Sequence, residues 1–451
     1  MSRQIAIVGA GLVGCALAHM LARRGHEIVM YEKRQAADAP DSQERRSTHL
    51  VVSARGWKAL GDIGVADQVR DMSLPLAGRC IHLPGQAPHF QPYGADGQTI
   101  FAIQRSALNR LLRELCADNP RIDMRFAHRC IDAQASQGRL TVLNSKTGRV
   151  TESEVDILFA ADGAFSGVRG ALMKREAMEI SQRSEHYGYK EFTLSGGQAL
   201  SLRADTMHAW PRGDASLFAF PNADGSFTGT LIAPFNGHKG FSSLDDARSI
   251  TALFDTLFPD VSPDAFIHEL LDNPASSLFT FRCRPWVFAG RAALIGDAAH
   301  AMVPFLGQGM NAGFEDCSAL MDLLDKHHED FARALPEFES SRRDNCEAVT
   351  DMSLQAFEEL SQSIGNPEFL FRRSLQQRIQ ALFPQRYAAP YDLIAFTHTP
   401  YAEVKARIDE LERLTDAILD AASPALLMDE DASDRYIHMV IDRQKEFSHA
   451  A

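Results

Sequence analysis

The chain has 451 residues, with 46 Lys and Arg against 59 Asp and Glu, which gives a formal net charge of −13. This acidic balance argues against nucleic acids and anionic membranes as partners, because both repel negative charge. The hydrophobic fraction of 45% is sufficient for a globular core, and a chain of this length is expected to form about three domains.

Membrane anchors and metal sites are also disfavoured. No apolar run approaches the roughly 20 residues that a membrane helix requires, and the segment 1–4 leads directly into an expected strand without a signal peptide. The seven cysteines form no CxxC pair, so we expect buried free thiols of a reducing compartment and no bound metal. These features predict a soluble, cytoplasmic protein.

The first elements along the chain predict a dinucleotide site. An apolar strand, 5–8, runs into the turn Gly9-Ala10-Gly11-Leu12-Val13-Gly14, which is followed by a helical run to position 24 and a second strand, 27–31. This is the GxGxxG fingerprint in a complete βαβ unit, where the glycines allow a tight turn and the close approach of a pyrophosphate. Glu32 ends the second strand, where a carboxylate can accept both hydroxyls of a ribose. The fingerprint alone does not distinguish FAD from NAD.

Arginines mark the next elements. Arg45 and Arg46 precede a predicted strand, 48–53, and Arg105 opens a predicted helix, 106–116, after a strand at 100–103. A cation is disfavoured at a helix start, where the helix dipole is positive. Arg105 could be an ordinary surface residue, but a phosphate group beside it would explain its position.

A third nucleotide-binding element is predicted at 155–169. A buried strand ends in Asp162-Gly163, and a helix with Arg169 in its first turns follows. Alone, this segment would be an ordinary turn; after the GxGxxG unit, it indicates a second contact with the same ligand.

Residues 183–235 differ in character and predict a substrate-binding lobe. The apolar and aromatic run 217–232 turns at Asp224-Gly225, which is typical of a β-hairpin. Together with residues 78–93 this hairpin can form a sheet that covers the bound cofactor. Arg79 and Tyr93 flank a strand-like run; each could equally be an exposed polar residue, and an aromatic stripe is more often plain core.

The stretch 296–311 organises the rest of the chain. It joins an expected buried strand, 292–295, to an expected helix, 312–325. Asp297 can accept a hydrogen bond from a sugar or polyol hydroxyl, and the turn Gly307-Gln308-Gly309 lets the backbone approach a ligand. The helix that begins there would direct unpaired N–H groups at the same ligand. An ordinary strand-to-helix connection with a glycine bend is the alternative.

Beyond position 331 the chain predicts several amphipathic helices with acidic outer faces, which end near 421 and near 445. The last fifty residues either pack on the substrate lobe or form a partner surface, and the sequence does not distinguish these two arrangements. It does not predict an oligomeric state either.

The order and spacing of these motifs resemble those of the single-component flavoprotein aromatic hydroxylases, the relatives of p-hydroxybenzoate hydroxylase. A closer resemblance, over about residues 1–400, is to the kynurenine 3-monooxygenase family. It rests on five segments: 78–82, 92–94, 186–191, 208–212 and 303–317.

This resemblance implies an α/β protein with a Rossmann-type FAD-binding domain, a β-sheet substrate lobe and a helical C-terminal region. The FAD-binding domain would be discontinuous and would comprise residues 1–75, 98–178 and 280–330. Residues 76–97 and 179–279 would form the substrate lobe, and residues 331–451 the C-terminal region.

The resemblance also implies FAD, extended along the first domain, and NADPH as co-substrate without a Rossmann domain of its own, in agreement with the single fingerprint. The implied FAD contacts come from the pyrophosphate turn, the ribose-binding strand end, the phosphate and ribityl region and the flavin edge: Gly9, Gly11, Val13, Gly14, Glu32, Lys33, Arg34, Arg105, Asp162, Gly163, Asp297, Gly309, Met310 and Asn311. No side chain is expected to act as an acid or base, because the flavin carries the chemistry.

The activity that the resemblance implies is hydroxylation of L-kynurenine at the 3 position, ortho to the amine, through a flavin hydroperoxide, as a step of tryptophan catabolism. Arg79, Tyr93 and Tyr391 match the family's ligands for the substrate carboxylate, which an arginine can bind in bidentate fashion. A fourth ligand, an asparagine, is replaced here by Ala356. This departure leaves open the same chemistry on a modified kynurenine, an anthranilate or another aryl amino acid of secondary metabolism. A flavin-carrying regulatory protein without hydroxylase activity is a further alternative.

Overall fold

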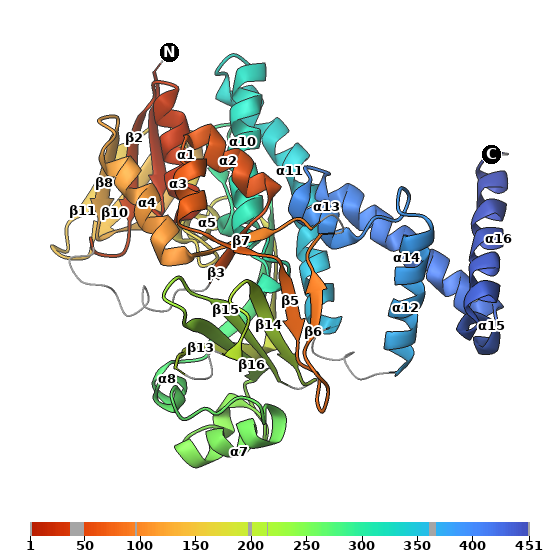
Figure 1. The fold of residues 1–451 in the computed structure, drawn as a ribbon. Helices are drawn as coiled ribbons and strands as arrows, with labels where there is room; N and C mark the ends of the chain where they lie inside the picture. Colours follow the sequence, from red (N-terminus) through yellow and green to blue (C-terminus); the bar gives the residue numbers. More distant parts are fainter. Residues whose placement is uncertain are drawn as a thin grey trace.

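The structure is a computed structural model, and it describes residues 2–36, 49–94, 97–196, 201–213, 215–359 and 367–449. Its elements form one body built on a mainly parallel sheet, a lobe built on a large, mainly antiparallel sheet, and a carboxy-terminal helical region (Figure 1). This arrangement agrees with the α/β fold expected from the sequence. Arg45 and Arg46, which the sequence places before a strand, lie outside the described residues.

The first body is built on a six-stranded sheet, in the order β18 (Val287–Phe288), β19 (Ala292–Leu294), β12 (Ile157–Ala160), β1 (Gln4–Val8), β2 (Glu27–Glu32) and β8 (Ile122–Phe126). Every neighbouring pair is parallel except β18 and β19. The central strands are short and mostly apolar, as expected for strands that are buried on both faces. Because β1, β12 and β19 run in the same direction, the turns that follow them open at one edge. We call these turns, residues 9–11, 161–163 and 296–297, the motif edge.

Helices cover this sheet and fix the turns at its edge. Helix α1 (Leu12–Arg23) packs against α4 (Arg105–Ala117) and α10 (Gly309–Lys326), and α10 also packs against α2 (Ala54–Ile63). Helix α10 begins slightly earlier than the sequence predicts. The remaining elements of this body are α3 (Ala66–Asp71), α5 (Gly167–Leu172), α9 (Asp297–His300), the sheet of β11 (Val150–Glu154), β10 (Arg139–Asn144) and β9 (His128–Gln134), and the sheet of β3 (His49–Val52), β7 (Ile100–Gln104) and β4 (Leu74–Leu76).

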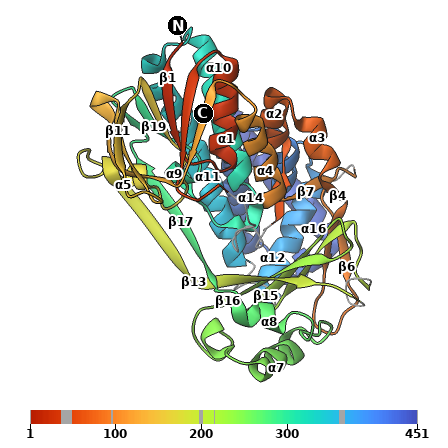
Figure 2. The ribbon, with the colours of Figure 1, turned by 90° about the vertical axis from the view of Figure 1, so that its left-hand side faces the viewer.

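The lobe is a seven-stranded sheet, in the order β17 (Ser276–Arg284), β13 (Glu179–Leu194), β16 (Phe227–Pro234), β15 (Ser216–Pro221), β14 (Thr206–Pro211), β5 (Gly78–Ile81) and β6 (His89–Pro92). The predicted hairpin is confirmed as β15 and β16, whose register pairs Pro221 with Phe227. The predicted union with residues 78–93 is confirmed by the pairing of β14 with β5. Strands β13 and β17 run side by side from the first body into the lobe (Figure 2), and α7 (Ala247–Leu257) and α8 (Ile267–Asp272) pack on the lobe through a shared apolar core.

The C-terminal region is helical, as expected. It comprises α11 (Phe331–Glu358), α12 (Pro367–Leu382), α13 (Pro390–Phe396), α14 (Tyr401–Ala421), α15 (Pro424–Met428) and α16 (Glu430–His449). Helices α12, α14 and α16 share a small apolar core of their own, which includes Ile379, Ile418 and Ile437. The last fifty residues therefore pack on the helices that precede them, and α16 lies at the outer end of this region (Figure 1). Among the described helices, none has an apolar stretch long enough to cross a bilayer.

All seven cysteines are buried free thiols, as the sequence predicts. Burial raises the pKa of Cys130 to about 12, and it raises the pKa of Cys283 to the same value. These thiols are therefore protonated at neutral pH.

Candidate cofactor and substrate site

The three motifs that are distant in sequence meet at the motif edge. A Cβ atom on Gly9, which has a φ of +106°, would lie 2.4 Å from the carbonyl oxygen of Ala161 and 2.8 Å from the Cα of Asp162. A Cβ atom on Gly296 would lie 3.2 Å from Cγ2 of Val13. The turn after β1 therefore touches the turn after β12, and the residue after β19 touches the first turn of α1, at positions where an added Cβ atom would be crowded.

The glycines of the fingerprint have two different roles. A Cβ atom on Gly14 would lie 2.0 Å from the oxygen of Gly9, so Gly14 is required for the packing of α1 against the turn. Gly11 instead has an extended backbone, and a Cβ atom there would meet no described atom within 4 Å. Gly11 also precedes α1, whose first turn receives no side-chain cap from the described residues. Open space beside uncapped N–H groups fits a pyrophosphate.

Glu32 shapes the same turn. Its Oε2 accepts a hydrogen bond from the backbone N–H of Ala10 at 2.8 Å, and its Oε1 accepts from the backbone and the Nε of Arg34, both at 2.9 Å. Burial alone would raise the pKa of Glu32, but the bonds from Arg34 and Ala10 outweigh it and lower the pKa. The carboxylate is therefore ionised and fixed at the predicted ribose end of the site, and Lys33 beside it is exposed.

The two carboxylate oxygens of Asp162 have different surroundings among the described residues. Its Oδ2 accepts from the backbone N–H groups of Gly167 at 2.7 Å and Val168 at 3.2 Å. Its Oδ1 is buried and accepts no hydrogen bond from any described residue, and burial raises the pKa of this group. A buried acceptor without a partner is costly unless a ligand supplies the donor. Together with the left-handed backbone of Gly163 (φ +80°), this feature fits a bound cofactor at the motif edge.

Asp297 follows the third strand and is exposed, whereas its neighbours Gly296 and Ala298 are buried. Arg169 fixes the backbone next to Asp297. Its guanidinium donates to the backbone oxygens of Ala298 at 2.7 Å and of Ala164 at 2.6 Å. Because Arg169 is itself buried, it joins the second motif to the third and does not face a ligand. The exposed carboxylate of Asp297 is then available for a hydroxyl group.

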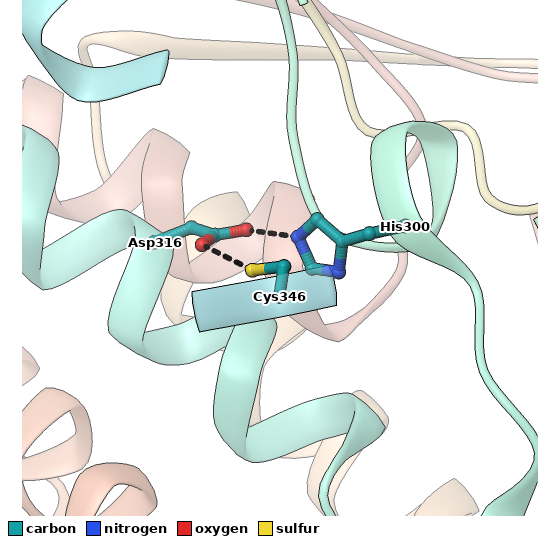
Figure 3. A group of neighbouring side chains, drawn as sticks. All are labelled: His300, Asp316 and Cys346. Carbon is teal, nitrogen blue, oxygen red and sulfur yellow. Dashed lines mark hydrogen bonds and ion pairs between the residues drawn. The ribbon is translucent and has the colours of Figure 1, made fainter. Parts of the chain in front are cut away.

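A buried ion cluster supports the same segment from the side of α10 and α11 (Figure 3). Oδ2 of Asp316 accepts from the backbone N–H of Gly296 at 3.1 Å and lies 2.7 Å from Nε2 of His300; Oδ1 accepts from Nε of Arg342 at 2.8 Å. Burial would raise the pKa of Asp316, but the charges of His300 and Arg342 outweigh it and lower the pKa. Burial would lower the pKa of His300, but the adjacent Cys346 and Asp316 raise it.

His300, Asp316 and Cys346 are residue types that bind metals, and their ligand atoms lie within 4.8 Å of one another. However, the guanidinium of Arg342 is bonded to the same carboxylate, and its positive charge opposes a metal cation there. The physical role of the cluster is to hold Gly296, and hence Asp297, in position.

The turn before α10 is also fixed by side chains. Asn311 is fully buried, its Oδ1 accepts from the backbone N–H of Ser53 at 2.9 Å, and its Nδ2 donates to the oxygens of Val51 at 2.8 Å and Gly307 at 2.9 Å. The side-chain amide of Asn311 is thus committed to the backbone of β3 and of the turn. A flavin ring at this turn could therefore be contacted only by the backbone of Gly309, Met310 and Asn311 and by the side chain of Met310.

Arg105 lies at the first position of α4 and is exposed. Burial raises the pKa of Tyr189 on β13, and the positive charge of Arg105 offsets part of that rise, so the two residues are near each other. The contact of Arg105 with the phosphate–ribityl region of FAD stays a prediction.

The predicted carboxylate ligands lie together. The rings of Tyr93 and Tyr391 stack with centroids 5.5 Å apart, although the two residues are far apart in sequence. Burial raises the pKa of Tyr391 to about 12, and the nearby charge of Arg79 counteracts part of this rise. Arg79 itself is exposed, and its Nε donates to Oε1 of Gln91 at 2.9 Å. Both tyrosines belong to an apolar cluster with Val51, the residue that a Cβ on Gly307 would contact at 3.4 Å.

An aromatic cluster next to these residues was not identified from the sequence. It joins the lobe, the segment after α9 and helix α11, and contains Ile232, Leu278, Val303, Leu354 and Phe357 with Tyr187, Tyr189, Phe218 and Phe305 packed on them. Its members come from separate segments, and the hydrophobic pattern of each segment is typical of an ordinary protein core. Ala356 lies on α11 between Leu354 and Phe357 and is half-buried, which keeps it near this cluster.

Comparison with known proteins agrees with this geometry. A sequence model described as FAD binding domain matches residues 2–353. The kynurenine 3-monooxygenase of Flavobacterium johnsoniae is 37% identical over 414 residues, which cover 90% of this chain and 91% of the relative. The kynurenine 3-monooxygenase of Myxococcus xanthus is 36% identical over 433 residues, which cover 95% and 92% of the two chains.

Solved structures show the same fold. The tetrameric form of 2-methyl-3-hydroxypyridine-5-carboxylic acid oxygenase superposes with a TM-score of 0.66 at 21% identity, over 81% of this chain and 94% of that one. PqsL, a probable FAD-dependent monooxygenase from Pseudomonas aeruginosa, superposes with a TM-score of 0.64 at 19% identity, over 80% and 97%. At these identities the likeness concerns the fold alone.

Proposed function

The chain belongs to the family of FAD-binding monooxygenases that contains the kynurenine 3-monooxygenases, and from this membership we propose that it hydroxylates L-kynurenine at the 3 position, with FAD, NADPH and oxygen. The observation that carries the substrate is the grouping of Arg79, Tyr93 and Tyr391, whose apolar cluster includes Val51 next to the turn before α10. This grouping offers one cation and two hydroxyl groups to a carboxylate. The domain division given above, with its discontinuous FAD-binding part, is proposed with it.

The residues at the motif edge fit FAD. Gly11 leaves room for the pyrophosphate, Glu32 would lie at the ribose end, and the buried Oδ1 of Asp162 lacks a donor among the described residues that a ligand could supply. Asp297 and the first turn of α10 would face the ribityl chain and the flavin. Bound FAD supplies electron transfer from NADPH and the activation of oxygen.

The protein itself has to bind, orient and shield the substrate. Arg79 and the two tyrosines would bind the amino-acid end of kynurenine. This contact would orient the aromatic ring of the substrate toward the flavin. The aromatic cluster around Phe305 and Phe357 would exclude water from the ring. In this assignment no side chain needs to transfer a proton to the ring, so acid–base residues are not required.

Product analysis tests the proposal directly. The protein loaded with FAD should consume NADPH in step with L-kynurenine and yield one product that is heavier by a single oxygen atom, as measured by mass spectrometry. Anthranilate and 2-aminoacetophenone, which keeps the aminobenzoyl ring but lacks the carboxylate, should react poorly. Efficient turnover of either compound would favour the alternative substrates, and FAD binding without any hydroxylated product would favour a regulatory role.

Arg79→Ala should weaken kynurenine binding by about one to two orders of magnitude, because a charged hydrogen bond contributes roughly 1.5–3 kcal/mol. FAD content should not change, since Arg79 is not part of the motif edge. Arg203→Ala is the matched control, because Arg203 is an exposed arginine of the same lobe whose ion partner is Asp205. Binding titrations should show no loss for 2-aminoacetophenone; an equal loss for both ligands would rule out the carboxylate role.

Ala356→Asn tests the departure from the family pattern. If Ala356 faces the substrate, an added amide should tighten kynurenine by up to about a decade, because one new hydrogen bond contributes roughly 1 kcal/mol. A water molecule can occupy this position in the present chain, so kynurenine would still be a substrate. A bulkier natural substrate would instead be hindered. Michaelis constants for kynurenine and for ring-substituted kynurenines distinguish these cases, and unchanged constants would mean that Ala356 does not face the site.

A further inference from the structure

Gln308 is the middle residue of the glycine turn that precedes α10, and its side chain is buried at 1% exposure. Its amide oxygen accepts a hydrogen bond from the hydroxyl of Tyr401 at 2.7 Å. Tyr401 is the first residue of α14, in the C-terminal region, and is itself fully buried. The side-chain amide nitrogen of Gln308 donates to the oxygen of Leu306 at 3.3 Å, so the one amide joins the turn to the distant tyrosine.

The tyrosine is held in place by Arg55. The guanidinium of Arg55 lies 3.9 Å from the centre of the Tyr401 ring. It donates to the backbone oxygens of Ile394 at 2.9 Å and Thr397 at 3.1 Å, and also to that of Thr399. Its Nε bonds Glu315 of α10 at 3.1 Å. Arg55 therefore clamps segment 394–401 onto the helix that begins at the turn.

Two independent features connect this clamp to the site. Helix α13, which begins at Pro390 and carries Tyr391, ends inside the clamped segment. Arg55 also lies in the first turn of α2, three residues after the end of β3, and Val51 of β3 and Ser53 just after it both bond Asn311. The turn, β3 and the segment with Tyr391 are thus joined by one set of buried polar contacts.

We infer that Tyr401 is a positioning residue for the flavin, which acts by fixing Gln308 and hence the direction of the N–H groups at the start of α10. The inference rests on the proposed placement of FAD at this turn. Burial raises the pKa of the Tyr401 phenol, so its hydroxyl stays protonated and can donate throughout the working pH range. Without this donor the buried oxygen of Gln308 would have no partner, and the turn would have to move to find one.

FAD affinity of the apoprotein tests the inference without any turnover. Tyr401→Phe should weaken FAD binding roughly tenfold in fluorescence titrations, because one buried acceptor loses its donor. It should also shift the visible absorption of the bound flavin. Tyr387→Phe is the matched control: Tyr387 is a buried tyrosine of the same region whose hydroxyl donates to Glu410 at 3.2 Å, in a separate apolar core. That variant should keep FAD affinity within about twofold, even if both variants melt at lower temperature.

A double-mutant cycle separates positioning from a general loss of stability. Gln308→Leu combined with Tyr401→Phe removes both the donor and the acceptor of the Tyr401–Gln308 hydrogen bond, so the double variant should bind FAD better than the product of the two single effects predicts. Effects that simply multiply, or an unchanged FAD affinity in Tyr401→Phe, would overturn the inference. A wild-type protein that binds FAD but does not hydroxylate kynurenine would refute the proposed substrate and leave this result intact.

Discussion

Replacing Gly11 by valine should give a folded protein that no longer retains FAD. The added side chain would enter the open space in front of Gly11, where the described residues leave at least 4 Å free. That space is where the pyrophosphate has to approach the turn, and several charge-assisted hydrogen bonds of about 1.5–3 kcal/mol each would be lost. The expected loss of FAD affinity is on the order of a hundredfold or more.

The structure provides the controls for this experiment. Gly61 on α2 also has open space at its Cβ position and lies away from the motif edge, so Gly61→Val should retain FAD. Gly14→Ala is not informative, because its Cβ would strike the oxygen of Gly9 and disturb the fold itself. Absorption at visible wavelengths, together with circular dichroism to establish folding, decides the outcome. A folded Gly11→Val protein with a full complement of FAD would refute the placement of the cofactor.

Asp316→Asn should destabilise the protein by about 3–5 kcal/mol, because it removes the charge that balances a buried arginine. Asp316 and Arg342 are both buried, and Nε of Arg342 lies 2.8 Å from Oδ1. The asparagine amide would also present a donor to one of the groups that now donate to the carboxylate. Since the pKa of Asp316 is lowered in the folded state, its contribution is present at neutral pH and is lost as the pH falls below 3.8.

Denaturant unfolding at several pH values measures this effect. Asp322→Asn on the same helix is the control, because its side chain is 70% exposed and its contact with Lys58 is 3.9 Å long; it should change stability by less than about 0.5 kcal/mol. The difference in the free energy of unfolding between wild type and Asp316→Asn should become smaller as the pH falls below 3.8. A difference that stays constant down to pH 3 would mean that the ionised carboxylate is not the stabilising species.

The local elements of the site could be predicted because short patterns determine them. The turn at Gly9 to Gly14, the strand that ends at Asp162 and the hairpin at Asp224-Gly225 each depend on a few adjacent residues. Their meeting at one edge follows from the parallel direction of the strands. Only the family resemblance predicted that Tyr93 and Tyr391 belong to one site, and their stacking was not predicted, since nothing in the local pattern joins those positions.

The supporting contacts could not be predicted, because they connect residues that are far apart in the chain. Tyr401 reaches Gln308 across 93 positions, and Arg55 reaches the oxygen of Thr397 across 342. A buried asparagine in a glycine-rich turn suggests a ligand contact, yet the amide of Asn311 bonds the protein backbone. The sequence also did not show whether the last helices pack on the substrate lobe or form a partner surface. In the structure they pack on α12 and α14, through apolar residues of three separate segments.

The burial of all seven cysteines has a consequence for the lifetime of the enzyme in use. An enzyme that activates oxygen releases hydrogen peroxide whenever the reduced oxygen is not transferred to a substrate. Peroxide oxidises the thiolate form of cysteine, and burial together with a raised pKa suppresses that form at Cys130 and Cys283. The remaining thiols are buried as well. The chain therefore exposes no sulfhydryl to its own by-product, and the sulfur atoms most accessible to peroxide belong to exposed methionines such as Met173 and Met428.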